Sequence, residues 1–268
     1  MAFGGWPAEA LEFYEGLEAD NSKSYWTSHK AVYEDTVLHP MEALTELLAP
    51  EFGDPKIFRP YRDIRFSADK TPYKTHIGAT IGRTCYVQFS ADGLAAGAGM
   101  WQLDPDRLAR YRTAVATEPT GPELAAIIAE LEKAGVEVHG HGTLKSAPRG
   151  YPPDHPRIDL LRHKGLTTWQ HWDPEPWLQT PSAAERIISF FRTSAAFCSW
   201  LTSNVGDLPA RVVRSASSSL IRKASRGNRR TTITGSCRTR RGNSTTRTVG
   251  SADSPPASPP PPPDGRAP

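Results

Sequence analysis

Long apolar runs are absent from this sequence of 268 residues, and no stretch approaches the roughly 20 apolar residues of a membrane helix. The first residues carry no basic stretch followed by an apolar run of signal-peptide length. Cysteine is also scarce. The three cysteines, Cys85, Cys198 and Cys237, are far apart and form no C-x-x-C pair. We therefore expect a cytoplasmic protein with no membrane span, no local zinc knuckle and no redox dithiol.

The common phosphate-loop and hydrolase motifs are missing as well. No Walker A loop, no G-x-G-x-x-G turn and no G-x-S-x-G elbow occurs, and the glycine-rich run 93–99 does not open a helix after a strand. The pair His139 and His141 has H-x-H spacing, but no recognised zinc or iron signature includes it. The sequence therefore predicts no metal and names no cofactor, and it disfavours the common nucleotide-binding and hydrolase classes.

Aromatic residues stop at Trp200, and the last 60 residues differ sharply in composition from the rest. Residues 209–268 contain twelve Lys and Arg against two Asp and Glu, so their net charge is +10, whereas residues 1–208 carry −7. So little apolar surface cannot offset the entropy of ordering, and we expect a disordered basic tail after a single domain at 1–208. Nucleic acid is an expected partner only non-specifically, through that tail.

Residues 1–208 show helical and strand periodicities in separate blocks. Apolar spacing predicts helices after Pro7, over 22–39 and 41–48, from 105, from 120, near 158–163, and over 182–204. Period-two alternation predicts strands over 57–66, 75–81, 85–90 and 94–101, with shorter ones near 136–139 and 167–171. Asp92-Gly93 is a strong hairpin signal. The pattern predicts an α+β domain in which an antiparallel meander sheet packs against helices.

Alternation also divides the strand side chains between two faces of that sheet. One set is an apolar core face that includes Ile77, Val87 and Phe89. The other set is glycine-rich and polar: His76, Gly78, Thr80, Tyr86, Gln88, Ser90, Gly97, Gly99 and Trp101. Glycine inside a strand can mark the close approach of a ligand or another backbone. A solvated face, or a helix packed tightly on it, explains the same pattern.

The most informative segment is residues 59–75, which we call the charged segment. Its charged residues alternate with apolar ones, unlike a charge run on a solvated helix face. The candidate site residues in it are Arg59, Arg62, Asp63, Arg65, Asp69, Lys70, Tyr73 and Lys74. Arginine presents a planar fork that matches carboxylate or phosphate, and lysine adds a mobile point charge. One interpretation is therefore a basic pocket for an anionic small molecule. The other is a structural network of ion pairs in a non-catalytic interaction module.

A second stretch, residues 144–156, contains Lys145, Arg149 and His155 in a loop stiffened by prolines. If this loop folds back on the charged segment, Lys145 and Arg149 would join the anion site. Asp63 and His155 are the first candidates for any proton transfer, although the sequence does not establish that a reaction occurs. Otherwise the loop is a packed connector, and His155 caps the next helix.

The charged segment reads R-x-x-R-D-x-R-F-S-x-D-K-x-P-Y-K-T and resembles the signature of a bacterial and fungal family, the domain of unknown function 2461. The similarity continues through residues 21–26, 86–88, 97–101, 108–112 and 144–156 and covers roughly residues 3 to 208. The resemblance implies an α+β domain without an established activity, so it transfers no catalytic residue. It also implies that the tail is an addition peculiar to this chain.

Overall fold

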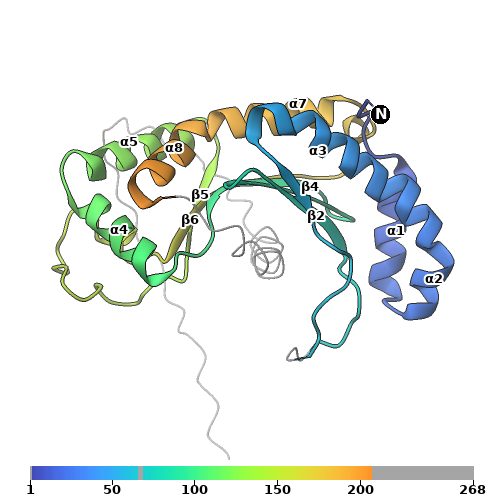
Figure 1. The fold of residues 1–268 in the computed structure, drawn as a ribbon, viewed down its shortest axis with the longest axis horizontal. Helices are drawn as coiled ribbons and strands as arrows, with labels where there is room; N and C mark the ends of the chain where they lie inside the picture. Colours follow the sequence, from blue (N-terminus) through green and yellow to red (C-terminus); the bar gives the residue numbers. More distant parts are fainter. Residues whose placement is uncertain (1, 66–68, 207–268) are drawn as a thin grey trace, which may run out of the picture. The chain divides into compact units, whose positions relative to one another are not determined.

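An antiparallel sheet of six strands lies at the centre of the structure, a computed structural model that describes residues 2–65 and 69–206 (Figure 1). The strand order is β1-β2-β3-β4-β6-β5. The strands are β1 (Pro55–Ile57), β2 (His76–Ile81), β3 (Cys85–Ser90), β4 (Gly93–Met100), β5 (Glu137–His141) and β6 (Gly165–Trp172). The α+β fold with a meander β2-β3-β4 is confirmed. The predicted disordered tail lies outside the described residues.

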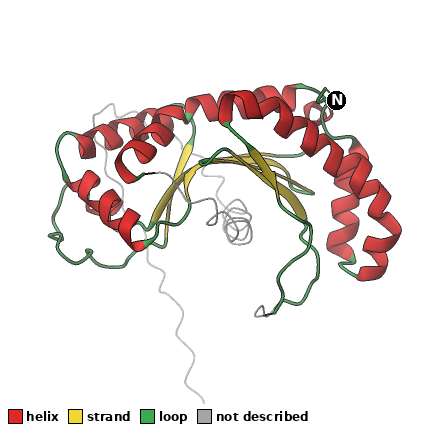
Figure 2. Cartoon of the chain, in the orientation of Figure 1, coloured by secondary structure: helices red, strands yellow, loops and turns green. Residues whose placement is uncertain are grey.

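Helices before, between and after the strands complete the fold (Figure 2). They are α1 (Ala8–Ala19), α2 (Lys23–Val32), the π-helix η1 (Tyr33–Leu38), α3 (His39–Phe52), α4 (Pro105–Ala116), α5 (Thr120–Lys133), α6 (Ile158–Leu161), the 3-10 helix η2 (Pro176–Gln179), α7 (Ser182–Thr193) and α8 (Ala195–Val205). Within the described part of the chain, no helix has both the length and the apolar character needed to cross a bilayer.

Helical structure continues through Pro40, where the sequence predicts a break. Helix α2 leads into η1 and then into α3 without an interruption, so residues 23–52 form one run. A proline ring crowds the carbonyl of the preceding turn and offers no N–H. The wider turn of η1, in which the N–H of His39 reaches the carbonyl of Glu34, lies just before Pro40 and accommodates that ring.

The last predicted helix, by contrast, is two helices that meet at Ser194. Ser194 is fully buried, and its hydroxyl lies 3.0 Å from the hydroxyl of Thr168 on β6. Thr168 in turn donates to the carbonyl of Ala98 on β4, at 3.2 Å. The junction of α7 and α8 is thus fastened to the sheet by a buried polar contact, which apolar periodicity does not reveal.

The apolar face of the sheet packs against helices, as alternation predicts. Helix α3 packs on β1 and β2, and α7 and α8 pack on β4, all on the same side of the sheet (Figure 1). Strand residues of this face are almost completely buried: Ile77, Ala79, Ile81, Cys85, Val87, Phe89, Leu94, Ala98 and Met100. Trp6, 1% exposed, stacks on Phe89 at 4.7 Å and fixes the N-terminal segment to this core.

The opposite face of the sheet, which we call the polar face, carries the residues of the second set. Registers across the strands align Thr80 with Tyr86, Tyr86 with Gly97, and Gly97 with Trp169. Tyr86 and Thr80 are partly exposed. Other polar residues of this face are buried: His76, Gln88, Ser90 and Thr167. Buried polar side chains are unusual on a sheet face, so this face is not simply exposed to solvent.

Candidate functional site

The charged segment forms an extended ribbon beyond the edge of the sheet. Strand β1 ends at Ile57, earlier than predicted, because Pro60 cannot donate to a ladder. The ribbon then continues through backbone bonds from Arg62 N to Pro72 O, at 2.9 Å, and from Lys74 N to Pro60 O, at 2.8 Å. Residues 66–68 lie outside the described residues. The segment therefore returns on itself and brings residues 59–62 beside residues 72–74.

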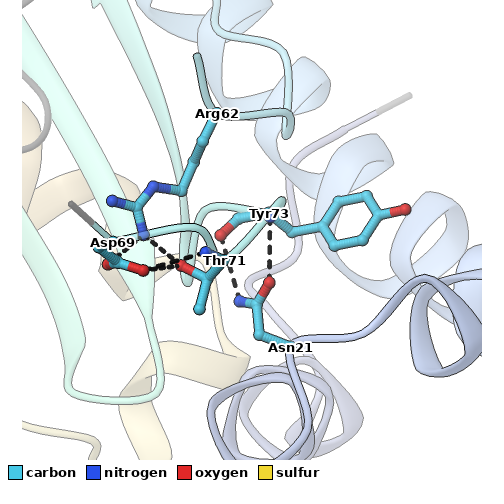
Figure 3. A network of polar contacts seen from close by, with 5 residues as sticks. All are labelled: Asn21, Arg62, Asp69, Thr71 and Tyr73. Carbon is cyan, nitrogen blue, oxygen red and sulfur yellow. Dashed lines mark hydrogen bonds and ion pairs between the residues drawn. The ribbon is translucent and has the colours of Figure 1, made fainter. Parts of the chain in front are cut away.

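Asn21 ties this ribbon to the helices at the N-terminal end of the domain. Its side-chain oxygen accepts a hydrogen bond from Tyr73 N, at 3.0 Å, and its side-chain nitrogen donates to Tyr73 O, at 3.2 Å (Figure 3). The amide thus makes both of the bonds that a neighbouring strand would make. Asn21 directly precedes Ser22, which caps helix α2. Residues 21–26, which belong to the resemblance to the family, therefore hold the charged segment in place.

A cluster of aromatic rings reinforces the same junction. Trp26 on α2 is 4% exposed and stacks on Tyr73 with ring centroids 4.4 Å apart and an interplanar angle of 9°. Tyr61 approaches both rings, at 6.1 Å from Trp26 and 5.5 Å from Tyr73. Phe13 contributes an edge contact with Trp26. Stacked and edge-to-face pairs of this kind add to the burial of apolar area, so the junction is a rigid one.

Arg62 and Asp69 neutralise each other inside the ribbon. The Arg62 guanidinium donates to the Asp69 carboxylate at 2.6 Å and also to the Thr71 hydroxyl (Figure 3). The same carboxylate accepts the Thr71 N–H at 3.0 Å and its hydroxyl at 2.8 Å. The Thr71 N–H first, and then Arg62, hold the pKa of Asp69 well below its usual range. Because the Arg62 side chain is only 19% exposed, this part of the segment is a structural network.

Arg65 and Asp63 form a second pair, which is exposed. Two hydrogen bonds of 2.9 and 2.7 Å join the guanidinium to the carboxylate. The Arg65 side-chain bond is the main reason why the pKa of Asp63 falls to about 2. A general base works best with a pKa near the operating pH, so Asp63 is poorly suited to proton transfer. Lys70 donates to the carbonyl of Ile64 at 3.1 Å and braces the same turn.

We expect the two pairs to respond differently to truncation. Arg62→Ala should lower the free energy of unfolding by roughly 1–2 kcal/mol, because hydrogen bonds to a largely buried charged group are lost. Arg65→Ala should leave the urea midpoint unchanged, because exposed ion pairs contribute little. Urea titrations of both variants measure this difference. Equal destabilisation by the two variants would contradict the division of the segment into a buried and an exposed pair.

Three basic side chains near the polar face differ from these pairs, and we call them the basic corner: Arg59, Lys74 and His76. Lys74 is half-buried, and its ammonium lies 5.4 Å from the centroid of the Phe58 ring. Burial first, and then the charge of Arg59, lower the pKa of Lys74. Among the described residues, neither Lys74 nor Arg59 forms an ion pair with a carboxylate.

His76 lies at the start of β2 and is 6% exposed. Burial first, and then Lys74 and Arg62, lower its pKa to about 3, so the imidazole is neutral at physiological pH. Its Nε2 atom has no hydrogen-bond partner among the described residues. The candidate anion site drawn from the sequence did not include His76. The available signal was a histidine on the polar side of the alternation, two residues after Lys74.

The second predicted stretch does not join this corner. It follows β5, whereas the charged segment follows β1, and these strands are the two opposite edges of the sheet (Figure 1). Lys145 and Arg149 are exposed there. His155 accepts the backbone N–H of Arg157 at 3.0 Å, but it does not cap α6, whose N-cap is Arg157 and has no side-chain cap bond. The expected convergence of the two cationic stretches is therefore not found, because four strands lie between β1 and β5.

The glycines of the polar face have a local explanation. A Cβ atom at Gly78 would lie 2.5 Å from the Tyr86 hydroxyl oxygen, and one at Gly97 would lie 2.9 Å from the Trp169 ring. Such distances are too short for a real side chain. Gly78 and Gly97 thus leave room for rings of neighbouring strands, a possibility that differs from each of the alternatives considered from the sequence. The Tyr86 hydroxyl donates to Gln88 Oε1 at 3.0 Å.

Comparison with known proteins supports the resemblance seen in the sequence. A family model described as conserved hypothetical protein (DUF2461) matches residues 9–200. Searches of curated proteins and of solved structures found no match. The matched range includes every strand of the sheet, the charged segment and helix α2, which carries Trp26. The chain therefore belongs to the DUF2461 family of conserved hypothetical proteins.

Proposed function

We propose that this domain binds a small molecule carrying a phosphate or carboxylate group at the basic corner. The observation that carries the proposal is the position of Lys74, a half-buried cation at the Phe58 ring that forms no ion pair with a carboxylate among the described residues. A buried charge without a counterion is unfavourable, and a bound oxyanion would supply the missing one.

The residues of the corner complement each other chemically. Arg59 offers a planar fork for two anion oxygens, and Lys74 offers a point charge on a flexible stem. His76 is neutral and can donate one ring N–H without adding charge. Arg62 and Asp69 then act as the scaffold that positions Lys74, since their network spans the same ribbon. This assignment proposes a smaller anion site than the sequence suggested, without Lys145 and Arg149.

Thermal unfolding of the full chain in sodium phosphate, compared with sodium chloride at equal ionic strength, tests the proposal. Phosphate at a hundredfold excess over its dissociation constant stabilises a folded protein by about 2.7 kcal/mol, which raises the melting temperature by several degrees. We expect this rise for the wild type and for Arg65→Ala, whose guanidinium is already paired. Lys74→Met and Arg59→Ala should lose most of it.

Arg65→Ala serves as the matched control, since it removes one cation from the same segment. If phosphate does not stabilise the wild type, or stabilises Lys74→Met equally, the anion site is wrong. The interaction-module alternative would then be preferred, because the Asn21 and Arg62 networks explain most of the charged segment without a ligand. That alternative leaves the isolated charge of Lys74 unexplained.

Two further expectations accompany the proposal. A cytoplasmic location is proposed because Cys85 and Cys198 are both free thiols.

Non-specific binding of nucleic acid remains a property to be tested on residues 209–268, which lie outside the described residues. Retention on DNA-cellulose at low salt, measured with and without those residues, separates a contribution of the tail from one of the domain.

A further inference from the structure

A row of aromatic rings crosses the polar face from the basic corner. The Lys74 ammonium faces the ring of Phe58 at 5.4 Å. The Phe58 centroid is 6.4 Å from that of Tyr86, and the Tyr86 centroid is 6.3 Å from that of Trp169. Tyr86 and Trp169 are nearly parallel, with an interplanar angle of 23°. The row thus connects a cationic end, beside β1, to an indole on β6.

The backbone beneath this row is shaped to receive it. Gly78 and Gly97 provide space that any larger residue would fill, and the rings of Tyr86 and Trp169 occupy it. The rings therefore lie close to the strands instead of standing upright. Phe58 and Tyr86 remain partly exposed, so a ligand anchored at Lys74 can contact them. A flat arrangement of rings is typical of surfaces that bind planar molecules.

One polar atom at the far end of the row is unsatisfied. The Trp169 side chain is 7% exposed, and its indole N–H has no acceptor among the described residues. Buried indole N–H groups usually have a hydrogen-bond partner, and one without a partner requires an explanation. His76 Nε2 is a second such atom, on the same face. Both nitrogen atoms are nearly inaccessible from outside, so a molecule on this face would contact the exposed rings and not these atoms.

We propose that the ligand is an aromatic oxyanion, such as an aryl phosphate. Its anionic group would contact Arg59 and Lys74, and its ring would lie along Phe58 and Tyr86. This inference rests on the proposed anion site and specifies the kind of molecule that the site selects. Charge complementarity with the basic corner is the reason for an anion, and the ring row is the reason for an aromatic body.

Isothermal titration of the full chain with inorganic phosphate, cyclohexyl phosphate and phenyl phosphate tests the inference. We expect phenyl phosphate to bind about tenfold more tightly than inorganic phosphate, and several-fold more tightly than the cyclohexyl compound. The last comparison separates an aromatic preference from simple burial of apolar area. Phe58→Leu should reduce the preference for phenyl phosphate and retain the affinity for inorganic phosphate. Tyr61→Leu, a change of an exposed ring outside the row, should alter neither.

The outcomes are distinct. Equal affinity for the three phosphates would overturn the aromatic inference while the anion site stands. No binding of any of them would overturn both. If Phe58→Leu does not fold, Tyr86→Leu gives the second test, because it removes the other partly exposed ring of the row and should likewise reduce the preference for phenyl phosphate. An unchanged preference of that variant for phenyl phosphate over cyclohexyl phosphate would contradict the role of the aromatic row.

Discussion

Replacing Trp26 by alanine should lower the free energy of unfolding by about 3–5 kcal/mol, the usual loss for a fully packed tryptophan in a core. The side chain is 4% exposed and contacts rings from three other parts of the chain. One of them is Tyr73, whose backbone Asn21 also holds. Truncation of Trp26 therefore removes the apolar half of a junction whose polar half is the pair of Asn21 bonds to Tyr73. Urea denaturation followed by circular dichroism measures the loss.

Tyr61→Ala is the matched control for this prediction. Tyr61 belongs to the same ring cluster and lies 6.1 Å from Trp26, but it is 48% exposed. Its truncation should change the free energy of unfolding by less than about 1 kcal/mol. A smaller effect for Trp26→Ala than for Tyr61→Ala would show that the cluster is not the anchor of the charged segment. The contrast also distinguishes packing at the junction from a general sensitivity of the ribbon.

Much of the fold follows from periodicity, because buried positions recur at fixed spacing along each element. Helix α4 begins at Pro105 with Asp104 as its cap, as the local residues predict. The two faces of the meander also agree with the alternation. Tertiary effects explain the differences. A π-helical turn accommodates Pro40, and a buried hydroxyl pair divides the last helix at Ser194. Neither effect has a signature in spacing alone.

The candidate site was less predictable for the same reason. The sequence shows which residues are charged but not how they pair, so it treats Arg62, Arg65 and Lys74 as equivalent. In the structure, Asp69 and Asp63 neutralise the two arginines and leave Lys74 without a carboxylate partner within the described residues. Pairing is decided by the return of the ribbon at residues 72–74. The separation of the two cationic stretches is likewise decided by strand order, which brings β6 and not β5 next to β4.

This difference between paired and unpaired groups leads to the second large effect, a loss of stability in mild acid caused by His76. In the unfolded chain, its imidazole has an ordinary pKa of about 6.5. In the folded domain, burial, with Lys74 and Arg62 nearby, lowers that pKa to about 3. Between these values only the unfolded state binds the proton, so unfolding is increasingly favoured as the pH falls. The expected slope is about 1.4 kcal/mol per pH unit.

Comparison of His76→Gln with the wild type isolates this contribution. Between pH 6.5 and pH 4, the wild type should lose about 3 kcal/mol more stability than the variant, measured by urea denaturation at each pH.

His163, whose pKa burial also lowers, contributes equally to both proteins and cancels. Asp63 and Asp69 act below this window, because their lowered pKa values lie under the ordinary value of 3.8. His171→Gln, a change of an exposed imidazole, should retain the full slope. If the wild type and His76→Gln lose stability in parallel, His76 is not held neutral by its surroundings. A bound phosphate should flatten the wild-type slope, because its negative charge raises the pKa of His76 in the folded state.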